Sequence, residues 1–452
     1  MSEIILEQFM RRGIELLYKD DPGIYELLEQ EYYRQTDTLT MVAASSIADP
    51  SVLVCEGMVT GNVTTEGYPG ARFHAGCEFA DEIERLAIKR AKEAFNAQYA
   101  NVQPHSGTSA NEIVIFSLLK PGDNILGLKL SSGGHLTHGA KVSVVGKYFN
   151  AIGYGLNQEG FIDYDQVHKL AQEFRPKLII SGASSYPRTI DFKRFREIAD
   201  EVGAFLLADI SHIAGLVVAG EHPSPIDFAH FVTTSTYKQL YGPRGGLILI
   251  GKDYDSLVPN GKSTLSEMIQ KAAFPFFQGT PNLSAIAAKA RALSIVTTPE
   301  FQKLAKRIVT NAQVLADCFI ERGYKVLTGG TDNHIVLIDI LANGITGVIA
   351  ERALEECNII VNKNVIPGDK KNATVTSGLR LGTNSLALRQ MTSNEMPICV
   401  DLMDKVLSSV NVYGEYNYDL KKVIKEIVQD NVKKLCRQFP IPCYSIPKSL
   451  VR

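Results

Sequence analysis

The stretch TTSTYKQLYGPRGG at residues 233–246 determines how the rest of the chain is interpreted. Its β-branched start predicts a strand, and the glycines and proline at 242–246 predict a turn, so Lys238 follows a strand end. α/β enzymes place reactive groups at such strand ends. The nearby cation of Arg244 and partial burial would both lower the lysine pKa from roughly 10.4, which favours a Schiff base with a carbonyl cofactor. By itself, a lysine after a strand is more often a solvated side chain, so other segments have to support this interpretation.

The composition is that of a soluble globular protein. At 452 residues the chain is long enough for two domains, with 45% hydrophobic and 21% charged residues and a net charge of -2. This near balance argues against a nucleic-acid-binding surface and a basic membrane patch, so the expected partners are small molecules. The seven cysteines lack metal-ligand spacing and predict reduced thiols and no metal site. Because no apolar run approaches the ~20 residues of a membrane span, we expect a cytoplasmic protein without a membrane partner.

The order of apolar and charged segments predicts an α/β protein. From about 80 to 250, short apolar strands alternate with charged helical stretches, which indicates a mostly parallel sheet covered on both faces. Residues 1–35 have helical spacing with a break at 20–23, and we interpret them as a helical arm that docks on another subunit. A large domain would span 36–290. A smaller α/β domain at 291–452 would end in a helical tail from about 411.

Two segments supply groups suited to a phosphorylated aromatic cofactor. Asp209 closes the strand AFLLAD, where a carboxylate can keep a pyridine nitrogen protonated so that the ring accepts electrons. Ser106, Gly107 and Thr108 precede the helix ANEIVIFSLL, and a helix start binds phosphate through its unpaired N–H groups and dipole. Each segment has a simpler alternative, since a carboxylate or a serine at such a position commonly caps the next helix.

Three further segments offer substrate-binding or proton-transfer groups. GGHLTHG supplies His135, which can stack on an aromatic ring, and His138, which we interpret as structural. Arg380 in TSGLRLGT has a planar fork that matches a carboxylate. Glu66 in TEGYPGARFHAG is a candidate for proton transfer. Taken singly, these would be a structural histidine, a surface arginine and a turn residue.

Together these motifs resemble the serine hydroxymethyltransferase family. The resemblance runs from about residue 40 to 405 through EGYPG, QPHSG, GGHLTHG, ADISHIAGL, GPRGG, GGTDNH, VNKN and TSGLRLGT. It implies the fold-type I, aspartate aminotransferase-like fold of pyridoxal-phosphate enzymes. It also implies a reaction at the Cα–Cβ bond of a β-hydroxy amino acid, interconverting serine and glycine with tetrahydrofolate, in a homodimer whose active site is shared between subunits.

The resemblance also implies roles for individual residues. Lys238 would hold the cofactor as a Schiff base, and Glu66 would come from the partner subunit. The implied catalytic residues are Lys238, Glu66, Asp209, His135 and His212. The implied cofactor-binding residues are Ser106, Gly107, Thr108, His135, Ser184, Asp209, His212, Thr236, Lys238 and Gly279. The substrate would meet Arg380, Thr64, His74 and Ser46, and folate would meet Glu66, Leu130, Gly134, Leu136 and Asn364.

The sequence departs from the family mainly on the substrate side. Ala44, Ser45 and Ser46 stand where the family usually has Ser-Glu-Asn. Thr64, Phe73 and His74 stand where the family has tyrosines. Tyr237 replaces the histidine before the lysine, and Tyr241 replaces a small or basic residue. Phe276, Phe277 and Thr280 replace glycines. Because polar groups without partners change specificity strongly, the pocket is expected to differ in what it accepts.

Three functions are compatible with these residues. The first is a divergent serine hydroxymethyltransferase, favoured by Glu66 and the implied folate contacts. The second is a folate-independent aldolase or transaldolase for a larger β-hydroxy amino acid, or an enzyme for an α-substituted serine. The third is a cofactor-binding protein without catalysis, against which the retention of Lys238, Asp209 and Arg380 argues.

Overall fold

The computed structural model describes residues 4–259 and 261–444, and within them the largest sheet has seven strands. In spatial order these are β4 (Tyr99–Asn101), β10 (Gly246–Ile250), β9 (Phe231–Ser235), β8 (Phe205–Asp209), β7 (Leu178–Gly182), β5 (Asn124–Leu128) and β6 (Asn150–Tyr154). The strands from β9 to β6 are parallel, and β10 runs antiparallel to both of its neighbours. The predicted α/β fold with a mostly parallel sheet is therefore confirmed.

Both faces of this sheet are covered by helices. Alternate residues of one strand enter different cores: Leu247 and Leu249 point to one face, and Ile248 and Ile250 to the other. One face packs against α5 (Gly107–Leu118), α6 (Val144–Tyr148) and α10 (Leu265–Lys271). The other packs against α4 (Glu78–Phe95), α7 (Tyr164–Phe174), α8 (Phe192–Val202), α9 (Ala214–Ala219), α11 (Leu283–Val296) and the first half of α12 (Pro299–Glu321). Burial on both faces explains why the strands are apolar throughout.

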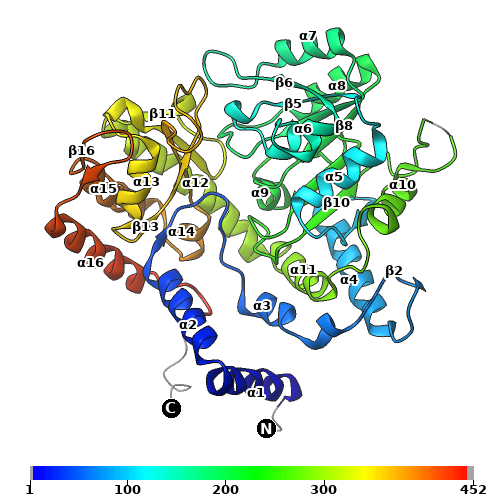
Figure 1. Cartoon of the computed structure of the whole chain (residues 1–452), viewed down its shortest axis with the longest axis horizontal. Coiled ribbons are helices and arrows are strands. Elements are labelled where there is room, and N and C mark those ends of the chain that lie inside the picture. Colours follow the sequence, from blue (N-terminus) through cyan, green and yellow to red (C-terminus); the bar gives the residue numbers. More distant parts are fainter. Residues whose placement is uncertain (1–3, 260, 445–452) are drawn as a thin grey trace.

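A second sheet lies in the other half of the molecule, at the left in Figure 1. Its order is β11 (Lys325–Val326), β12 (Ile335–Asp339), β15 (Gly378–Gly382) and β14 (Asn362–Asn364). The elements around its core include α13 (Gly347–Glu355), α14 (Asn384–Leu388), α15 (Met396–Leu407), α16 (Lys422–Gln438) and the pair of β1 (Leu39–Thr40) with β13 (Ile359–Ile360). The domain borders proposed at 35 and 290 fall within α2 (Pro22–Asp37) and α11, and the division into domains stays a prediction.

The two amino-terminal helices are exposed. α1 (Ile5–Asp20) and α2 contain no buried residue, and they lie below the main body in Figure 1. Asp21 separates them and accepts a hydrogen bond from Ile24 N, so the expected break is present. Leu6, Phe9 and Ile14 are about half exposed. Docking of this arm on another subunit stays a prediction. None of the described helices has the length and apolar character needed to cross a bilayer.

Candidate active site

Lys238 lies in the turn after β9, as the sequence predicts. Hydrogen bonds from Tyr241 N to Lys238 O (3.1 Å) and from Gly242 N to Thr236 O (2.9 Å) form this turn, and Thr236 Oγ1 donates to Pro243 O. The lysine is only 7% exposed. Burial lowers its pKa to about 8, against the opposing charge of Asp209, and the cation of Arg380 adds to the decrease. About a tenth of the amine is therefore neutral, and nucleophilic, at pH 7, far more than for a lysine with the ordinary pKa.

Asp209, at the end of β8, is held in its ionised form. Oδ2 accepts hydrogen bonds from Asn111 Nδ2 (2.8 Å) and His138 Nε2 (3.1 Å), and Oδ1 accepts from the backbone and hydroxyl of Ser211. Burial opposes ionisation, but the hydrogen bonds from His138 and Ser211 outweigh it, so the Asp209 pKa lies far below its usual range. Asp209 can therefore accept a proton-bearing ring nitrogen as a further partner.

The start of α5 forms the other end of the site. Ser106 is the N-cap, and its hydroxyl accepts from Ser109 N at 3.0 Å. A Cβ on Gly107 would lie 3.1 Å from Ser235 Cβ and 3.2 Å from Ser235 N, so glycine lets this helix start rest on the end of β9. The result is a set of helix-start N–H groups close to the Lys238 turn, which suits an anion.

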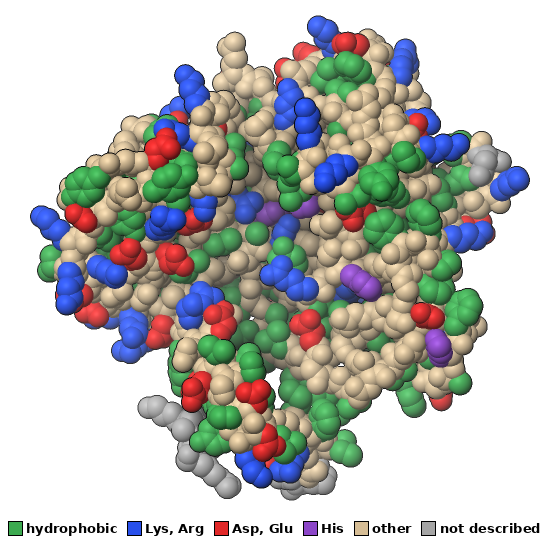
Figure 2. Space-filling view, viewed as in Figure 1, with side chains coloured by type: hydrophobic (Ala, Val, Ile, Leu, Met, Phe, Trp, Pro, Cys, Tyr) green, Lys and Arg blue, Asp and Glu red, His purple; other side chains and the backbone are tan. Residues whose placement is uncertain are grey.

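A cavity of about 230 Å³ joins these groups. Figure 2 shows the molecule hollowed at its centre, with histidine and basic side chains gathered there. The lining residues are Ser106, Gly107, Thr108, His135, Ala183, Ser184, Asp209, Ser211, His212, Ser235, Tyr237, Lys238, Arg244 and Gly245. The cavity thus brings together the lysine, the carboxylate, the helix start and both histidines that the sequence suggested.

Arg380 reaches toward this cavity from β15 of the second sheet. It is half-buried rather than a solvated surface charge: Nη1 donates to Ser184 O (2.6 Å) and Nε to Asn362 Oδ1 (3.2 Å). Burial lowers its pKa to about 10, so the side chain still carries its charge at neutral pH. A cation held in place by two acceptors can receive a carboxylate.

Two buried histidines connect the cavity to the second sheet. His212 and His334 stack with ring centroids 6.1 Å apart, and burial lowers the pKa of both below the usual range. His334 Nε2 lies 3.2 Å from Ala43 O. The Nδ1 atoms of both rings are buried without a hydrogen-bond partner among the described residues. Of the two residues, His212 lines the cavity, so a polar ligand bound there can satisfy its Nδ1.

Glu66 lies in a separate, exposed group. Its nearest side-chain partner is His74, at 3.4 Å, and a Cβ on Gly279 would lie 3.6 Å from Glu66 Oε1. Neither these three residues nor Thr64 line the Lys238 cavity. The hairpin of β2 (Gly67–Tyr68) and β3 (Ala71–Arg72) that follows Glu66 is well anchored.

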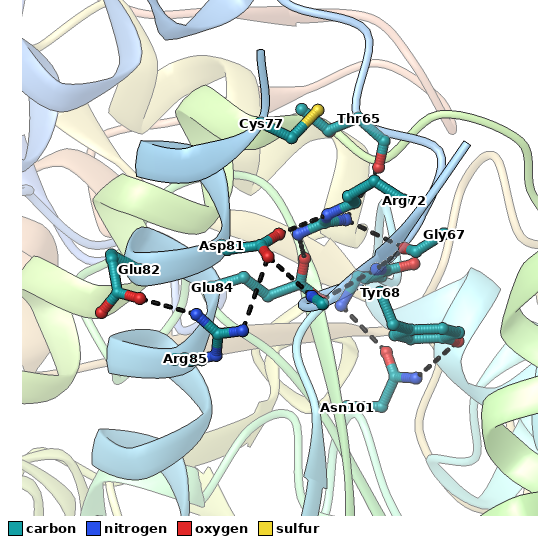
Figure 3. A network of polar contacts seen from close by, with 12 residues as sticks. Thr65, Gly67, Tyr68, Arg72, Cys77, Asp81, Glu82, Glu84, Arg85 and Asn101 are labelled. Carbon is teal, nitrogen blue, oxygen red and sulfur yellow. Dashed lines mark hydrogen bonds and ion pairs between the residues drawn. The ribbon is translucent and has the colours of Figure 1, made fainter. Parts of the chain in front are cut away.

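Figure 3 shows the anchor of this hairpin, which is centred on Arg72. Arg72 donates to Asp81 Oδ1 (2.8 Å) and Glu84 Oε2 (2.6 Å) of α4. It also donates to the carbonyls of Thr65 and Gly67, on either side of Glu66. The backbone of Glu66 is therefore rigid while its carboxylate remains in contact with solvent.

The remaining predicted residues have the following positions. Ser46 Oγ donates to Tyr237 O. The centroid of the Tyr237 ring lies 3.8 Å from Arg244 Cζ. Asn364 Nδ2 donates to Ser185 Oγ at 2.9 Å. Leu130 and Leu136 are each about half exposed. A Cβ on Gly134 would lie 2.0 Å from Leu128 O, so only glycine fits there.

Sequence reasoning missed the partners of Asp209. His138 was interpreted as structural, yet it binds this carboxylate directly; its Nδ1 accepts from His135 N, which leaves the proton on Nε2. Asn111 is an amide among the buried, mostly apolar residues of α5, and it binds Asp209, Thr137 and Thr233. A polar residue on a buried helix face was the available signal.

Comparisons with known proteins agree with this geometry. The family model described as serine hydroxymethyltransferase matches residues 17–403. A serine hydroxymethyltransferase of a Nitratiruptor species is 47% identical over 428 residues, which cover 95% of this chain and 99% of that protein. Another, from Rickettsia canadensis, is 45% identical over 425 residues, or 94% of this chain and 98% of that protein. The chain belongs to the serine hydroxymethyltransferase family.

Serine hydroxymethyltransferases are fold-type I enzymes that use pyridoxal phosphate, with tetrahydrofolate as co-substrate. The residues of the cavity fit that cofactor. Lys238 offers a nucleophilic amine, the start of α5 offers donors for a phosphate, and Asp209 is ionised. His212, whose Nδ1 has no partner among the described residues, also lines this cavity.

Proposed function

We propose that the chain interconverts serine and glycine with tetrahydrofolate, with pyridoxal phosphate bound at Lys238. The observation that carries this proposal is the arrangement of Lys238 between the start of α5 and the ionised Asp209, in a chain of this family. Both relatives named above are serine hydroxymethyltransferases, so the folate-independent aldolase is not favoured.

The proposed roles follow from charge and position. Bound pyridoxal phosphate supplies an electron sink for the pair of electrons left on the substrate α-carbon. Lys238 supplies the amine that holds the cofactor, Asp209 keeps a proton on the ring nitrogen, and Arg380 orients the substrate carboxylate. His212 lies where its Nδ1 can bind a polar group of the cofactor.

We further propose a homodimer in which the partner's Glu66 completes the site as the acid or base near the hydroxymethyl group. The separation of Glu66, His74 and Gly279 from the cavity of their own chain supports this arrangement. We also propose a cytoplasmic location. All seven cysteines lie in the described part of the chain and all are free, which is usual in a reducing compartment.

The test is a turnover assay on serine with and without tetrahydrofolate, beside threonine and allo-threonine. We expect serine cleavage that depends on folate. Lys238→Ala should abolish the visible absorption band of the bound cofactor, whereas Lys252→Ala, at an exposed lysine after β10, should keep it. Folate-independent cleavage with a preference for threonine would instead support the aldolase, and no response to any amino acid would support a protein without catalysis.

A further inference from the structure

Lys289 is a buried cation for which the proposed mechanism has no role. It lies in α11 and is only 2% exposed. Its Nζ donates three hydrogen bonds, all to main-chain carbonyls: Val102 O (2.7 Å), Pro104 O (3.0 Å) and Gly246 O (3.0 Å). A buried lysine needs such partners, because an unpaired ammonium in the interior is very costly.

These three carbonyls belong to the two segments that form the phosphate end of the cavity. Val102 and Pro104 lead from β4 into Ser106, the N-cap of α5. Gly246 begins β10, directly after Gly245, which lines the cavity. The two segments also contact each other, since Gly246 N donates to Pro104 O at 2.9 Å. Lys289 therefore links, through hydrogen bonds, the segment before α5 to the end of the turn that contains Lys238.

The ammonium lies directly behind Gly245. A Cβ on Gly245 would lie 2.9 Å from Lys289 Nζ and 2.3 Å from Cε, so the glycine allows the lysine to approach the cavity wall. Burial lowers the pKa of Lys289 to about 7, and the charge of Glu84 opposes this decrease. An anion bound on the other side of this wall would favour the charged form.

We propose that Lys289 is a positioning residue for the cofactor phosphate: it holds the start of α5 against Gly246 and places a buried positive charge behind the phosphate-binding wall. The inference rests on the proposed function, because it concerns the phosphate of pyridoxal phosphate. It predicts a much larger contribution to binding of the phosphate group than to binding of the ring or to Schiff-base formation at Lys238.

The experiment compares pyridoxal phosphate with pyridoxal, which has the same aldehyde and ring but no phosphate. Dissociation constants of both are measured by absorbance on the full-length chain, for the wild type, Lys289→Met, Lys289→Gln and Lys289→Arg. Arg291→Met is the matched control. It removes a cation from the same helix, but the partner of this cation is Ser51 Oγ and not a carbonyl of the phosphate end. Competition by inorganic phosphate is measured in parallel.

We expect Lys289→Met to weaken binding of pyridoxal phosphate about tenfold or more, and pyridoxal less than about twofold. Lys289→Arg should keep most of the preference for the phosphorylated form, and the control should resemble the wild type. If the Met variant does not fold, Lys289→Gln, which keeps donors but no charge, carries the same comparison. Equal losses for both ligands, or no loss, would overturn the inference. A wild type that binds neither ligand would instead refute the proposed function.

Discussion

At the scale of single residues, the site depends on a carboxylate that stays ionised although it is 6% exposed. Four donors make this possible at Asp209, and they arrive from three places: Asn111 of α5, His138 of the short helix at Leu136–His138, and the backbone and hydroxyl of Ser211. A hydrogen bond to an ionised carboxylate is stronger than a hydrogen bond between two neutral groups. The ionised Asp209 lines the cavity, so it can serve there as the partner of a cationic group.

Asp209→Asn tests that function. The amide is nearly isosteric but carries no charge, so it cannot keep a ring nitrogen protonated, and kcat should fall about 10²-fold or more. Attachment of the cofactor at Lys238 should remain, as seen from its absorption band. Asp165→Asn, at an exposed carboxylate that pairs with Arg194, serves as the control. An unchanged kcat would remove Asp209 from its assigned role.

The lowered pKa of Lys238 predicts a pH dependence for cofactor attachment. Only the neutral amine attacks an aldehyde, and its fraction rises with pH until the pKa is passed. The attachment rate should therefore rise about tenfold per pH unit and level off above about 8, rather than near the ordinary value of 10.5. The measurement is the rate at which the visible band appears after mixing the apo chain with pyridoxal, which has no phosphate group to titrate. The pH of 9.5 lies about midway between a pKa of about 8 and the ordinary value of 10.5. If the attachment rate still rises tenfold per pH unit there, the pKa of Lys238 is not lowered by its surroundings.

At the scale of elements, the contact between α5 and β9 sets the position of the helix start. In Gly107→Ala the new Cβ would be 3.1 to 3.3 Å from Ser235 Cβ, N and Cα, and the backbone of a fully buried strand has little room to move. We expect a loss of about 1–3 kcal/mol in stability and weaker binding of pyridoxal phosphate. Thermal melting and absorbance titration measure both. Gly13→Ala, in α1 with open space around it, should be neutral or slightly stabilising.

Arg389 holds the ends of two helices together. Its guanidinium donates to the carbonyls of Gln35, Thr36 and Thr38 at the end of α2, and to those of Cys436 and Phe439 at the end of α16. A cation at two helix ends also complements both dipoles. This side chain is therefore the main polar link between the amino-terminal arm and the carboxyl-terminal helix.

Arg389→Met should destabilise the chain by about 3 kcal/mol or more, because each buried acceptor left unpaired costs about 1–3 kcal/mol. Hydrogen exchange should accelerate in α2 and α16 before the central sheet is affected. Arg322→Met removes an arginine whose partner Asp401 is 64% exposed, and it should cost about 1 kcal/mol or less. Equal effects of the two variants would show that Arg389 is not such a link.

At the scale of the whole molecule, the sequence predicted the sheet and the groups at its strand ends, because apolar runs and glycine turns mark those places. Lys238, Asp209 and the helix start at Ser106 follow from that pattern. Arg389 and Lys289 could not be found in the same way. Arg389 bonds a carbonyl 354 residues away in the sequence, and Lys289 bonds one 187 residues away. Because every residue has a carbonyl, no side-chain pattern in the sequence marks these contacts.

The position of Glu66 leads to a prediction about the assembly. Glu66 is rigidly placed by Arg72, yet it lies outside the cavity of its own chain, so a site that uses it must take it from a second chain. In a symmetric dimer each chain would then give its Glu66 to the partner and receive one in return. Glu66→Gln and Lys238→Ala should each inactivate a homodimer.

Co-expression of these two variants should restore activity. In a mixed dimer one site has both residues intact and the other has neither. Purification through two different tags, one on each variant, isolates the mixed dimers, so serine cleavage per dimer should return to about half of the wild-type value. The control is a pair of Lys238→Ala chains that carry the same two tags. If Glu66 served the cavity of its own chain, the mixed dimer would be as inactive as the control, since neither chain alone would hold both groups.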